Sequence, residues 1–283
     1  MLMKSAPVSV IILTKNEQRR ITKTLECLGG FDDIWVVDSH SDDDTVALAQ
    51  DAGAQIASFT WDGHYPKKKQ WALDNLALRH DWVLMLDADE RMTPALNAEI
   101  CALFGAGAPS ARGYFVKGLY RVGDQILRHG QINKKLMLFN RHDFVFPDVR
   151  DDDFAGGWEV EGHYQPVRRK QSEQATLSVL KMHLVHDAFD DMAALDKRHE
   201  GYASWEALMC LNKRWPQDPV PWRQSLKKLF RALPLRWGAV FIYSYIVKGG
   251  ICDGRAGLAF ARQRALYYKD VARNKRAYRN KAD

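Results

Sequence analysis

Short apolar runs alternate with helix-like segments over the first third of the chain. The apolar runs are bounded by polar residues or glycine, as expected for buried strands, and they cover residues 8–13, 34–37, 55–59 and 82–87. Apolar residues at helical spacing lie between them, and helices are expected after Glu17, with Ile21, Leu25 and Leu28 on one face, at residues 45–50 and at residues 67–79. This alternation predicts an α/β fold in which a largely parallel sheet has helices on both faces.

Polar side chains follow three of these strands, at residues 14–17, 38–41 and 87–90. The carboxyl ends of parallel strands meet at one edge of a sheet, where open α/β sheets bind ligands. Asp87 and Asp89, one residue apart, can both serve a hard divalent cation that is shared with substrate phosphates. An acidic turn in a solvated loop is the alternative, and the residue pattern alone leaves both open.

The pattern changes after residue 113. Strands are expected at residues 113–120 and 135–140, and the chain is mostly helical from residue 188. Prolines at positions 216, 219 and 221 mark a break before the last segment. We therefore predict an α/β domain over residues 1–190 and a C-terminal helical segment over residues 191–283.

The composition is that of an ordinary globular protein with a sizeable core, because 46% of the 283 residues are hydrophobic and 27% are charged. No apolar stretch is long enough to span a bilayer, and no signal-peptide pattern is recognisable. The four cysteines have neither metal-binding nor redox spacing, which predicts free thiols and a cytoplasmic location. The sequence lacks Gly-x-Gly-x-x-Gly after its first strand and Gly-x-x-x-x-Gly-Lys anywhere, which argues against a Rossmann dinucleotide site and a P-loop.

The C-terminal segment holds most of the excess positive charge, which is +6 for the whole chain. Apolar and basic residues alternate there at helical spacing; they are Trp222, Leu226, Leu229, Phe230 and Leu233, with Arg223, Lys227, Lys228 and Arg231. A basic amphipathic helix suits the plane of an anionic membrane surface. A helix packed on the α/β domain is the alternative. Nucleic acid is not an expected partner, because no recognisable reader motif is present.

Three motifs in the first third of the chain carry a family resemblance. Residues 8–17, 36–45 and 87–91, which include the Asp87-Ala88-Asp89 motif, resemble the family 2 glycosyltransferases, whose fold is called GT-A. Residues 61–63, 81–83 and 183–186 are similar to the branch that builds lipopolysaccharide cores. The resemblance is close over the first third and extends to about residue 190. It implies a GT-A catalytic domain with a mixed sheet, and an enzyme of the hexosyltransferase type that takes part in cell-envelope lipopolysaccharide biosynthesis.

The resemblance also implies the substrates. An inverting transfer would move a sugar from a nucleotide-diphosphate donor, usually UDP-linked, to a hydroxyl of a lipopolysaccharide, polysaccharide or lipid-linked acceptor. Such acceptors favour a peripheral position on the cytoplasmic face of the inner membrane. Asp38 matches the aspartate that contacts the nucleotide base, and Thr14 and Glu17 match first-loop residues around the base and ribose.

A divalent metal, Mg²⁺ or Mn²⁺, is implied in the same way. Asp89 matches the main metal ligand, Asp87 contacts ribose or metal, and His186 matches a late histidine that approaches the metal and diphosphate. One departure concerns Lys69, which stands near the position of an arginine in relatives. Lysine keeps the positive charge but not the bidentate fork. A solvated helix start is the alternative for residues 67–69.

The catalytic base is less clearly marked. An inverting transfer requires a carboxylate that accepts the acceptor hydroxyl proton. The family's Val-His-Glu is absent, and residues 149–153 and 159–163 stand in that region. Glu161 is our first candidate for the base, followed by Glu159 and Asp151.

Two other functions compete with sugar transfer. A nucleotidyltransferase that makes the sugar nucleotide has a similar sheet, but it needs a glycine-rich, basic loop where this chain has Thr14-Lys15-Asn16-Glu17. A non-catalytic module that binds carbohydrate or lipid would be indicated by loss of Asp38 or Asp89, and both are present.

Overall fold

The computed structural model describes residues 5–149, 165–187, 189, 192–215 and 217–282. The chain forms two compact units. Unit 1 comprises residues 1–118, 133–146 and 166–187, and unit 2 comprises residues 119–132, 147–165 and 188–283. Unit 2 thus takes in residues 119–132 and 147–165 in addition to the C-terminal segment.

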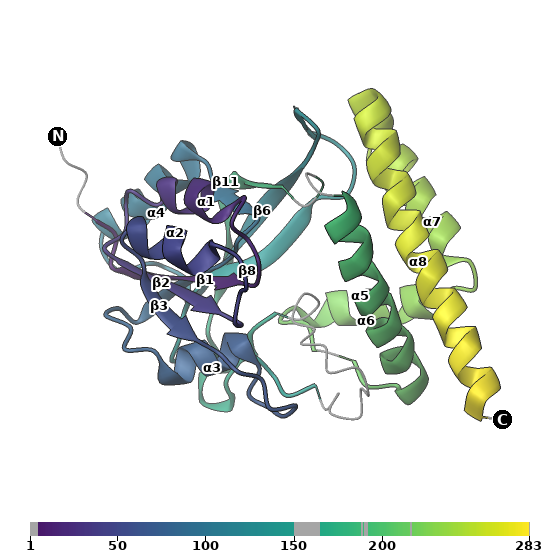
Figure 1. The fold of residues 1–283 in the computed structure, drawn as a ribbon, viewed down its shortest axis with the longest axis horizontal. Helices are drawn as coiled ribbons and strands as arrows, with labels where there is room; N and C mark the ends of the chain where they lie inside the picture. The colour runs from purple at the N-terminus through teal and green to yellow at the C-terminus, as the bar shows by residue number, and fades with distance from the viewer. Residues whose placement is uncertain (1–4, 150–164, 188, 190–191, 216, 283) are drawn as a thin grey trace. The chain divides into compact units, whose positions relative to one another are not determined.

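Unit 1 is built on the main sheet (Figure 1). Its strands are β1 (Val8–Thr14), β2 (Asp33–Asp38), β3 (Gln55–Ser58), β4 (Trp82–Asp87), β5 (Glu90–Met92), β6 (Gly113–Val122), β8 (Asn133–Asn140), β9 (Phe144–Val145), β10 (Val167–Arg168) and β11 (Leu177–His186). Its helices are α1 (Ile21–Glu26), α2 (Thr45–Asp51), α3 (Lys68–Asn75) and α4 (Pro94–Gly105), with a 3-10 turn at Lys170–Ser172. The end of β6 continues into unit 2, where it pairs with β7 (Gln125–Ile126).

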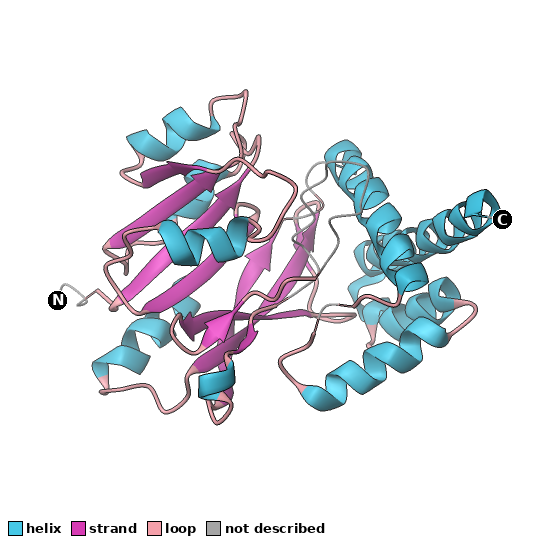
Figure 2. Ribbon diagram, turned by 90° about the horizontal axis from the view of Figure 1, so that it is seen from below, coloured by secondary structure: helices cyan, strands magenta, loops and turns pink. Residues whose placement is uncertain are grey.

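The main sheet is mixed. Its strand order is β3-β2-β1-β4-β8-β6-β11-β5. The first four strands run parallel, whereas β8 is antiparallel to both β4 and β6, and β5 is antiparallel to β11. Helices α1, α2 and α4 cover one face and α3 lies on the other (Figures 1 and 2). The predicted α/β class, with a mixed sheet, helices on both faces and a C-terminal helical segment, is confirmed.

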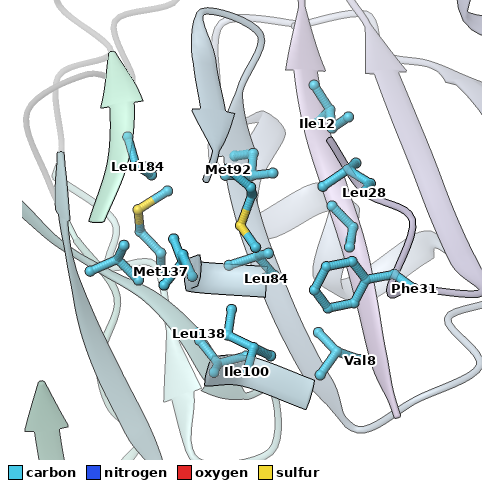
Figure 3. Packing of buried hydrophobic residues seen from close by; sticks show 14 of the residues in the cluster. Val8, Ile12, Leu28, Phe31, Leu84, Met92, Ile100, Met137, Leu138 and Leu184 are labelled. Carbon is cyan, nitrogen blue, oxygen red and sulfur yellow. The ribbon is translucent and has the colours of Figure 1, made fainter. Parts of the chain in front are cut away.

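The core explains why the first strands are continuous apolar runs. Val8, Val10 and Ile12 of β1 point to the face covered by α1, α2 and α4, and they pack there with Leu28 and Leu84 (Figure 3). The intervening residues of β1 are buried on the opposite face. A parallel strand that is buried on both faces needs apolar residues at successive positions rather than alternate ones.

The third predicted helix is shorter than expected. Residues 67–79 were expected to be helical, but α3 ends at Asn75. The next residues are held by side chains of other strands: the Arg79 N–H donates to Asp33 (2.8 Å) and the His80 N–H donates to Ser9 (3.1 Å). These long-range hydrogen bonds satisfy the backbone outside a helix, so the helical pattern is overridden.

Two strands of the sheet are not indicated by the sequence pattern. β11 carries exposed as well as buried residues, and β5 is only three residues long. Their antiparallel register pairs Leu184 with Met92 and His186 with Glu90. This pairing places the end of β11 beside the residues that follow β4.

Unit 2 is mostly helical, as expected from residue 188 onwards. Its helices are α5 (Met192–Asn212), α6 (Pro221–Ala232), α7 (Arg236–Ile242) and α8 (Gly254–Ala282), with a π-helical turn at Tyr243–Val247 and a 3-10 turn at Gly250–Asp253. α5 and α8 pack through small residues against large ones, with Ala203 and Ala207 beside Tyr267 and Val271. In the described part of the chain, no helix combines the length and apolar character that crossing a membrane requires.

Candidate active site

The loops after β1 and β2 are joined at the carboxyl edge of the sheet. Thr14 and Asp38 are partners in the parallel register, and the Thr14 hydroxyl donates to the Asp38 carboxylate at 2.9 Å. The Lys15 ammonium donates to the backbone carbonyl of Ser39 at 2.8 Å, and the Asn16 N–H donates to Ser41 Oγ at 2.8 Å. The predicted donor-site residues Thr14 and Asp38 are therefore brought together.

Asp38 itself is buried and closes the turn after β2. Its carboxylate accepts the Ser41 N–H at 2.7 Å and the Ser41 hydroxyl at 2.5 Å, in addition to the Thr14 hydroxyl. These bonds give Asp38 a structural role in the loop, which is the role that an aspartate after a strand often takes. They also fix the orientation of the carboxylate at the sheet edge.

Glu17 lies in the same pair of loops. Its backbone N–H donates to the Thr45 hydroxyl at 2.7 Å, so the start of α2 is attached to the loop after β1. Its side chain forms an ion pair with Arg20 at 2.7 Å, and both side chains are largely buried. The loop conformation around Glu17 is therefore set by α2 as well as by β1.

The start of α3 contributes three consecutive buried lysines, Lys67, Lys68 and Lys69. The Lys68 ammonium donates to the Thr14 carbonyl at 3.3 Å. The Lys67 ammonium lies over the Trp61 ring and that of Lys69 lies over the Phe146 ring, at 5.5 and 5.9 Å from the ring centroids. The alternative of a solvated helix start is therefore wrong. Buried ammonium groups need compensating negative charge, either from the protein or from a ligand.

Asp87, at the end of β4, lies in a cluster of opposite charges. The Lys135 ammonium contacts Asp87 Oδ2 at 2.5 Å and Glu90 Oε1 at 2.8 Å, and the Lys69 ammonium is 3.9 Å from Asp87 Oδ1. Glu90 is almost fully buried and also accepts the Asp87 N–H at 3.0 Å. Lys135, near the start of β8, thus links that strand to the end of β4.

Charge pairing shifts the pKa values of Asp87 and Lys135 more than burial does. Burial raises the pKa of the Asp87 carboxyl, but the ammonium groups of Lys135 and Lys69 lower it more, so the pKa is well below its ordinary value. Burial lowers the pKa of Lys135, but Asp87 and Glu90 raise it well above its ordinary value. Asp87 is therefore ionised and Lys135 protonated throughout the neutral range.

Asp89 and His186 form a second pair, which exists because β11 pairs with β5. His186 Nε2 is 3.3 Å from Asp89 Oδ1, and the N–H of Asp187, directly after β11, donates to the Asp89 carbonyl at 2.8 Å. Burial lowers the pKa of His186, but the neighbouring Asp89 carboxylate raises it more, and the net shift is upward. Asp187 is held in turn by Arg91 at 2.7 Å.

The Asp89–His186 pair fits a divalent metal. Mg²⁺ is commonly bound through one or two carboxylates together with substrate phosphates and water, and imidazole suits transition metals such as Mn²⁺ as a further ligand. In the described residues, no group of three His, Cys, Asp or Glu side chains converges to hold a metal. A bound diphosphate and water would supply further ligands beside Asp89. Asp87, which pairs with Lys135, precedes Asp89 by two positions in the sequence.

The three candidates for the catalytic base, Glu161, Glu159 and Asp151, lie outside the described residues. Two features of this cluster were not predicted from the sequence: Glu90 as a partner of the motif, and the contact of Lys135 with Asp87 and Glu90. Glu90 follows the Asp-X-Asp motif directly, and this adjacency is the one signal that could have found it. Lys135 is 48 residues from Asp87 in the chain, and no local pattern indicates their contact.

A known protein family matches the region of the chain that holds this site. Residues 9–111 match the model of a family described as glycosyl transferase family 2. The matched region includes β1 to β4, Asp38 and the Asp-X-Asp motif. This match over residues 9–111 confirms the resemblance to the family 2 glycosyltransferases.

Similar proteins carry glycosyltransferase names. A glycosyltransferase of Rickettsia conorii is 33% identical over 166 residues, which are 53% of this chain and 57% of that protein. The lipopolysaccharide core biosynthesis glycosyltransferase LpsC of Rhizobium meliloti is 37% identical over 105 residues, 35% of this chain and 38% of LpsC. The match thus spans little more than half of the Rickettsia protein and less than half of LpsC.

Solved structures were also compared. Mannosyl-3-phosphoglycerate synthase from Rubrobacter xylanophilus is 27% identical, with a TM-score of 0.33 and 42% of each chain covered. TarS from S. aureus is 15% identical, with a TM-score of 0.44, 96% of this chain and 91% of that chain covered.

Proposed function

We propose that this protein transfers a sugar from a nucleoside-diphosphate donor, UDP-linked, to a hydroxyl of a lipopolysaccharide, polysaccharide or lipid-linked acceptor, with inversion at the anomeric carbon. One observation carries the proposal: the buried Lys69 of α3 and the partly buried Lys135 of β8 meet Asp87 at the end of β4, at the edge where β1 and β2 also end. A site with both cations and metal-binding carboxylates suits a diphosphate better than a neutral ligand.

In this proposal the donor lies along the sheet edge. The base lies beside Asp38, Thr14 and Glu17, which the interlocked loops hold in place. The diphosphate lies toward Lys69 and Asp89. A diphosphate linked to a sugar carries two negative charges and a divalent cation carries two positive ones, so both can enter together without upsetting the existing charge balance of the site.

The chain's own residues have distinct tasks. Asp89 and His186 would hold the metal, while Lys69 and Lys135 place positive charge near the leaving diphosphate. A divalent ion, when bound, supplies Lewis-acid stabilisation of the charge that develops on the leaving group. A carboxylate in the region of residues 151–161 would accept the proton of the attacking hydroxyl, with Glu161 as the first candidate.

The acceptor class follows from similarity to the lipopolysaccharide core glycosyltransferase LpsC. A glycolipid acceptor has its lipid anchored in a bilayer. We therefore place the enzyme in the cytoplasm, peripherally on the cytoplasmic face of the inner membrane.

Donor binding tests the proposal. Nucleoside diphosphates and their sugars, with UDP-glucose among them, are titrated into the protein by calorimetry with Mn²⁺, with Mg²⁺ and with EDTA. We expect a UDP-linked compound to bind in a metal-dependent way, and Asp89→Asn to lose that dependence while keeping its circular dichroism spectrum.

Asp81→Asn is the matched control, because Asp81 directly precedes β4, at the end opposite Asp87 and Asp89, and its carboxylate pairs with His142 at 2.9 Å. This control should bind like the wild type. If no nucleoside-diphosphate compound binds, or if Asp89→Asn binds in the same metal-dependent way, the donor site is wrongly assigned.

A further inference from the structure

One side of α6 carries large apolar residues that face solvent. Trp222, Leu226, Leu229 and Leu233 follow one another at helical spacing, with exposed fractions between 42% and 65%, and we name this set the α6 stripe. No residue of α6 is buried. The apolar side of an amphipathic helix normally faces the core of a globular protein. The α6 stripe faces away from it.

Contacts on the basic side of α6 fix this orientation. Phe230 packs edge-to-face on Tyr268 of α8, with ring centroids 5.3 Å apart. The Lys227 ammonium contacts Asp218, whose carboxylate is buried, at 2.6 Å, and the Arg231 guanidinium lies 3.9 Å from the centroid of the Trp215 ring. The exposure of the α6 stripe is therefore a consequence of specific packing within unit 2.

More exposed apolar residues follow α6 in the sequence. Further large apolar residues with exposed fractions above 40% follow in the next fifteen positions; they are Leu235, Trp237, Ile242, Tyr243, Ile246 and Val247. Single exposed apolar residues are ordinary, but a concentration of ten in one segment marks an interaction surface.

The charge of the same segment indicates what this surface meets. Residues 213–255 contain nine Lys or Arg and only two acids, Asp218 and Asp253. Both acids are buried, so the exposed charge of this segment is entirely positive, with Lys228 and Lys248 among the exposed cations. A second copy of this chain would bring like charges together. An anionic bilayer offers both apolar depth and negative charge.

We propose that the α6 stripe and the exposed side chains that follow it dock on an anionic lipid bilayer. In this arrangement Trp222 and the leucines enter the boundary between headgroups and acyl chains, and Lys228 stays at the lipid phosphates. This surface would hold the enzyme at the peripheral location proposed above. It rests on unit 2 and requires neither donor nor acceptor, so its failure is distinguishable from failure of sugar transfer.

Vesicle co-sedimentation with the full chain tests the apolar part. The protein is mixed with vesicles of phosphatidylcholine alone or with added phosphatidylglycerol. We expect binding to the anionic vesicles, and a fall in the partition coefficient of about a hundredfold for Leu226→Ser/Leu229→Ser, since each of the two leucines contributes about a tenfold factor when it is buried in the bilayer. Leu266→Ser is the matched control, because Leu266 is 49% exposed on α8 of the same unit, and it should bind as the wild type does.

A charge reversal tests the electrostatic part. Lys228→Glu should lower partitioning about tenfold at low salt and make the remaining binding less sensitive to salt. Lys269→Glu, at an exposed position of α8, is its control and should have a smaller effect. These side chains are exposed, so the variants should fold, and circular dichroism checks this.

Three results would overturn the proposal. The first is a full-length protein that ignores anionic vesicles at low salt. The second is equal binding to neutral and anionic vesicles. The third is a dimer in analytical ultracentrifugation that Leu226→Ser/Leu229→Ser converts to monomer, which would assign the α6 stripe to self-association.

Discussion

Lys135→Met is the perturbation that tests the charge cluster most sharply. Methionine keeps much of the length and apolar surface of lysine and removes only the ammonium group. Glu90 then keeps the N–H of Asp87 at 3.0 Å but loses its ion pair at 2.8 Å, and Asp87 keeps Lys69 at 3.9 Å. Removal of one partner of a buried ion pair costs about 3–5 kcal/mol.

The expected cost lies at the lower end of that range. The Asp87 side chain is 33% exposed, and water screens part of its interaction with Lys135. We therefore expect Lys135→Met to lower the free energy of unfolding by about 3 kcal/mol at pH 7. Lys134→Met is the matched control on the same strand, because Lys134 is exposed, and it should change the free energy of unfolding by less than about 0.5 kcal/mol.

The pH dependence distinguishes lost charge pairing from lost packing. In the wild type the depressed pKa of Asp87 contributes stability above the ordinary carboxyl pKa of 3.8, and that contribution is lost as pH falls through the depressed value. In Lys135→Met the Asp87 carboxylate lacks its nearest cation, so the pKa of Asp87 rises and protonation relieves the penalty as pH falls. The difference between the two proteins should therefore narrow from pH 7 to pH 4.

Urea unfolding at a series of pH values, followed by circular dichroism, measures this difference. A destabilisation by Lys135→Met that is the same at pH 4.5 and pH 7 would show that packing, not charge, is lost. A variant as stable as the wild type at pH 7 would refute the claim that Lys135 balances the buried Glu90.

Two further predictions concern other parts of the fold. Thr24→Val should lower the free energy of unfolding by about 1 kcal/mol and weaken metal-dependent donor binding, because the buried Thr24 hydroxyl donates to the Ala88 carbonyl at 2.7 Å. Calorimetry on the variant measures both effects. An unchanged donor affinity would contradict the positioning role of Thr24. Gly257→Ala should lower the free energy of unfolding by at least about 2 kcal/mol, as measured by thermal melting, because the added Cβ would lie 1.9 Å from the Gly250 carbonyl oxygen. Gly238→Ala, with open space around the added Cβ, should be neutral or slightly stabilising. Equal melting temperatures for those two variants would refute the steric argument.

The first half of unit 1 was predictable from the sequence because its signals are local. β1, β2 and β4 are short apolar runs buried by the fold, and α4 begins where the Thr93 side chain accepts the Leu96 N–H. A motif that follows each of three parallel strands could likewise be placed at one edge without knowledge of the fold.

The rest depends on contacts between distant parts of the chain. The end of α3 is set by Asp33 and Ser9, which lie in other strands. β5 is too short to have a pattern, and His186 reaches Asp89 only because β11 pairs with it. Lys135 belongs to a strand whose neighbour in the sheet, β4, lies about fifty residues earlier. No short stretch of the sequence contains both residues of any of these contacts.

A crystal structure of the full chain with UDP and Mn²⁺ tests the central claim most directly. We expect the uracil beside Asp38, the diphosphate beside Lys69, and the metal held by Asp89 with His186. Nucleotide found at the opposite edge of the sheet, near the amino ends of β1 and β4 where Asp81 lies, would contradict it.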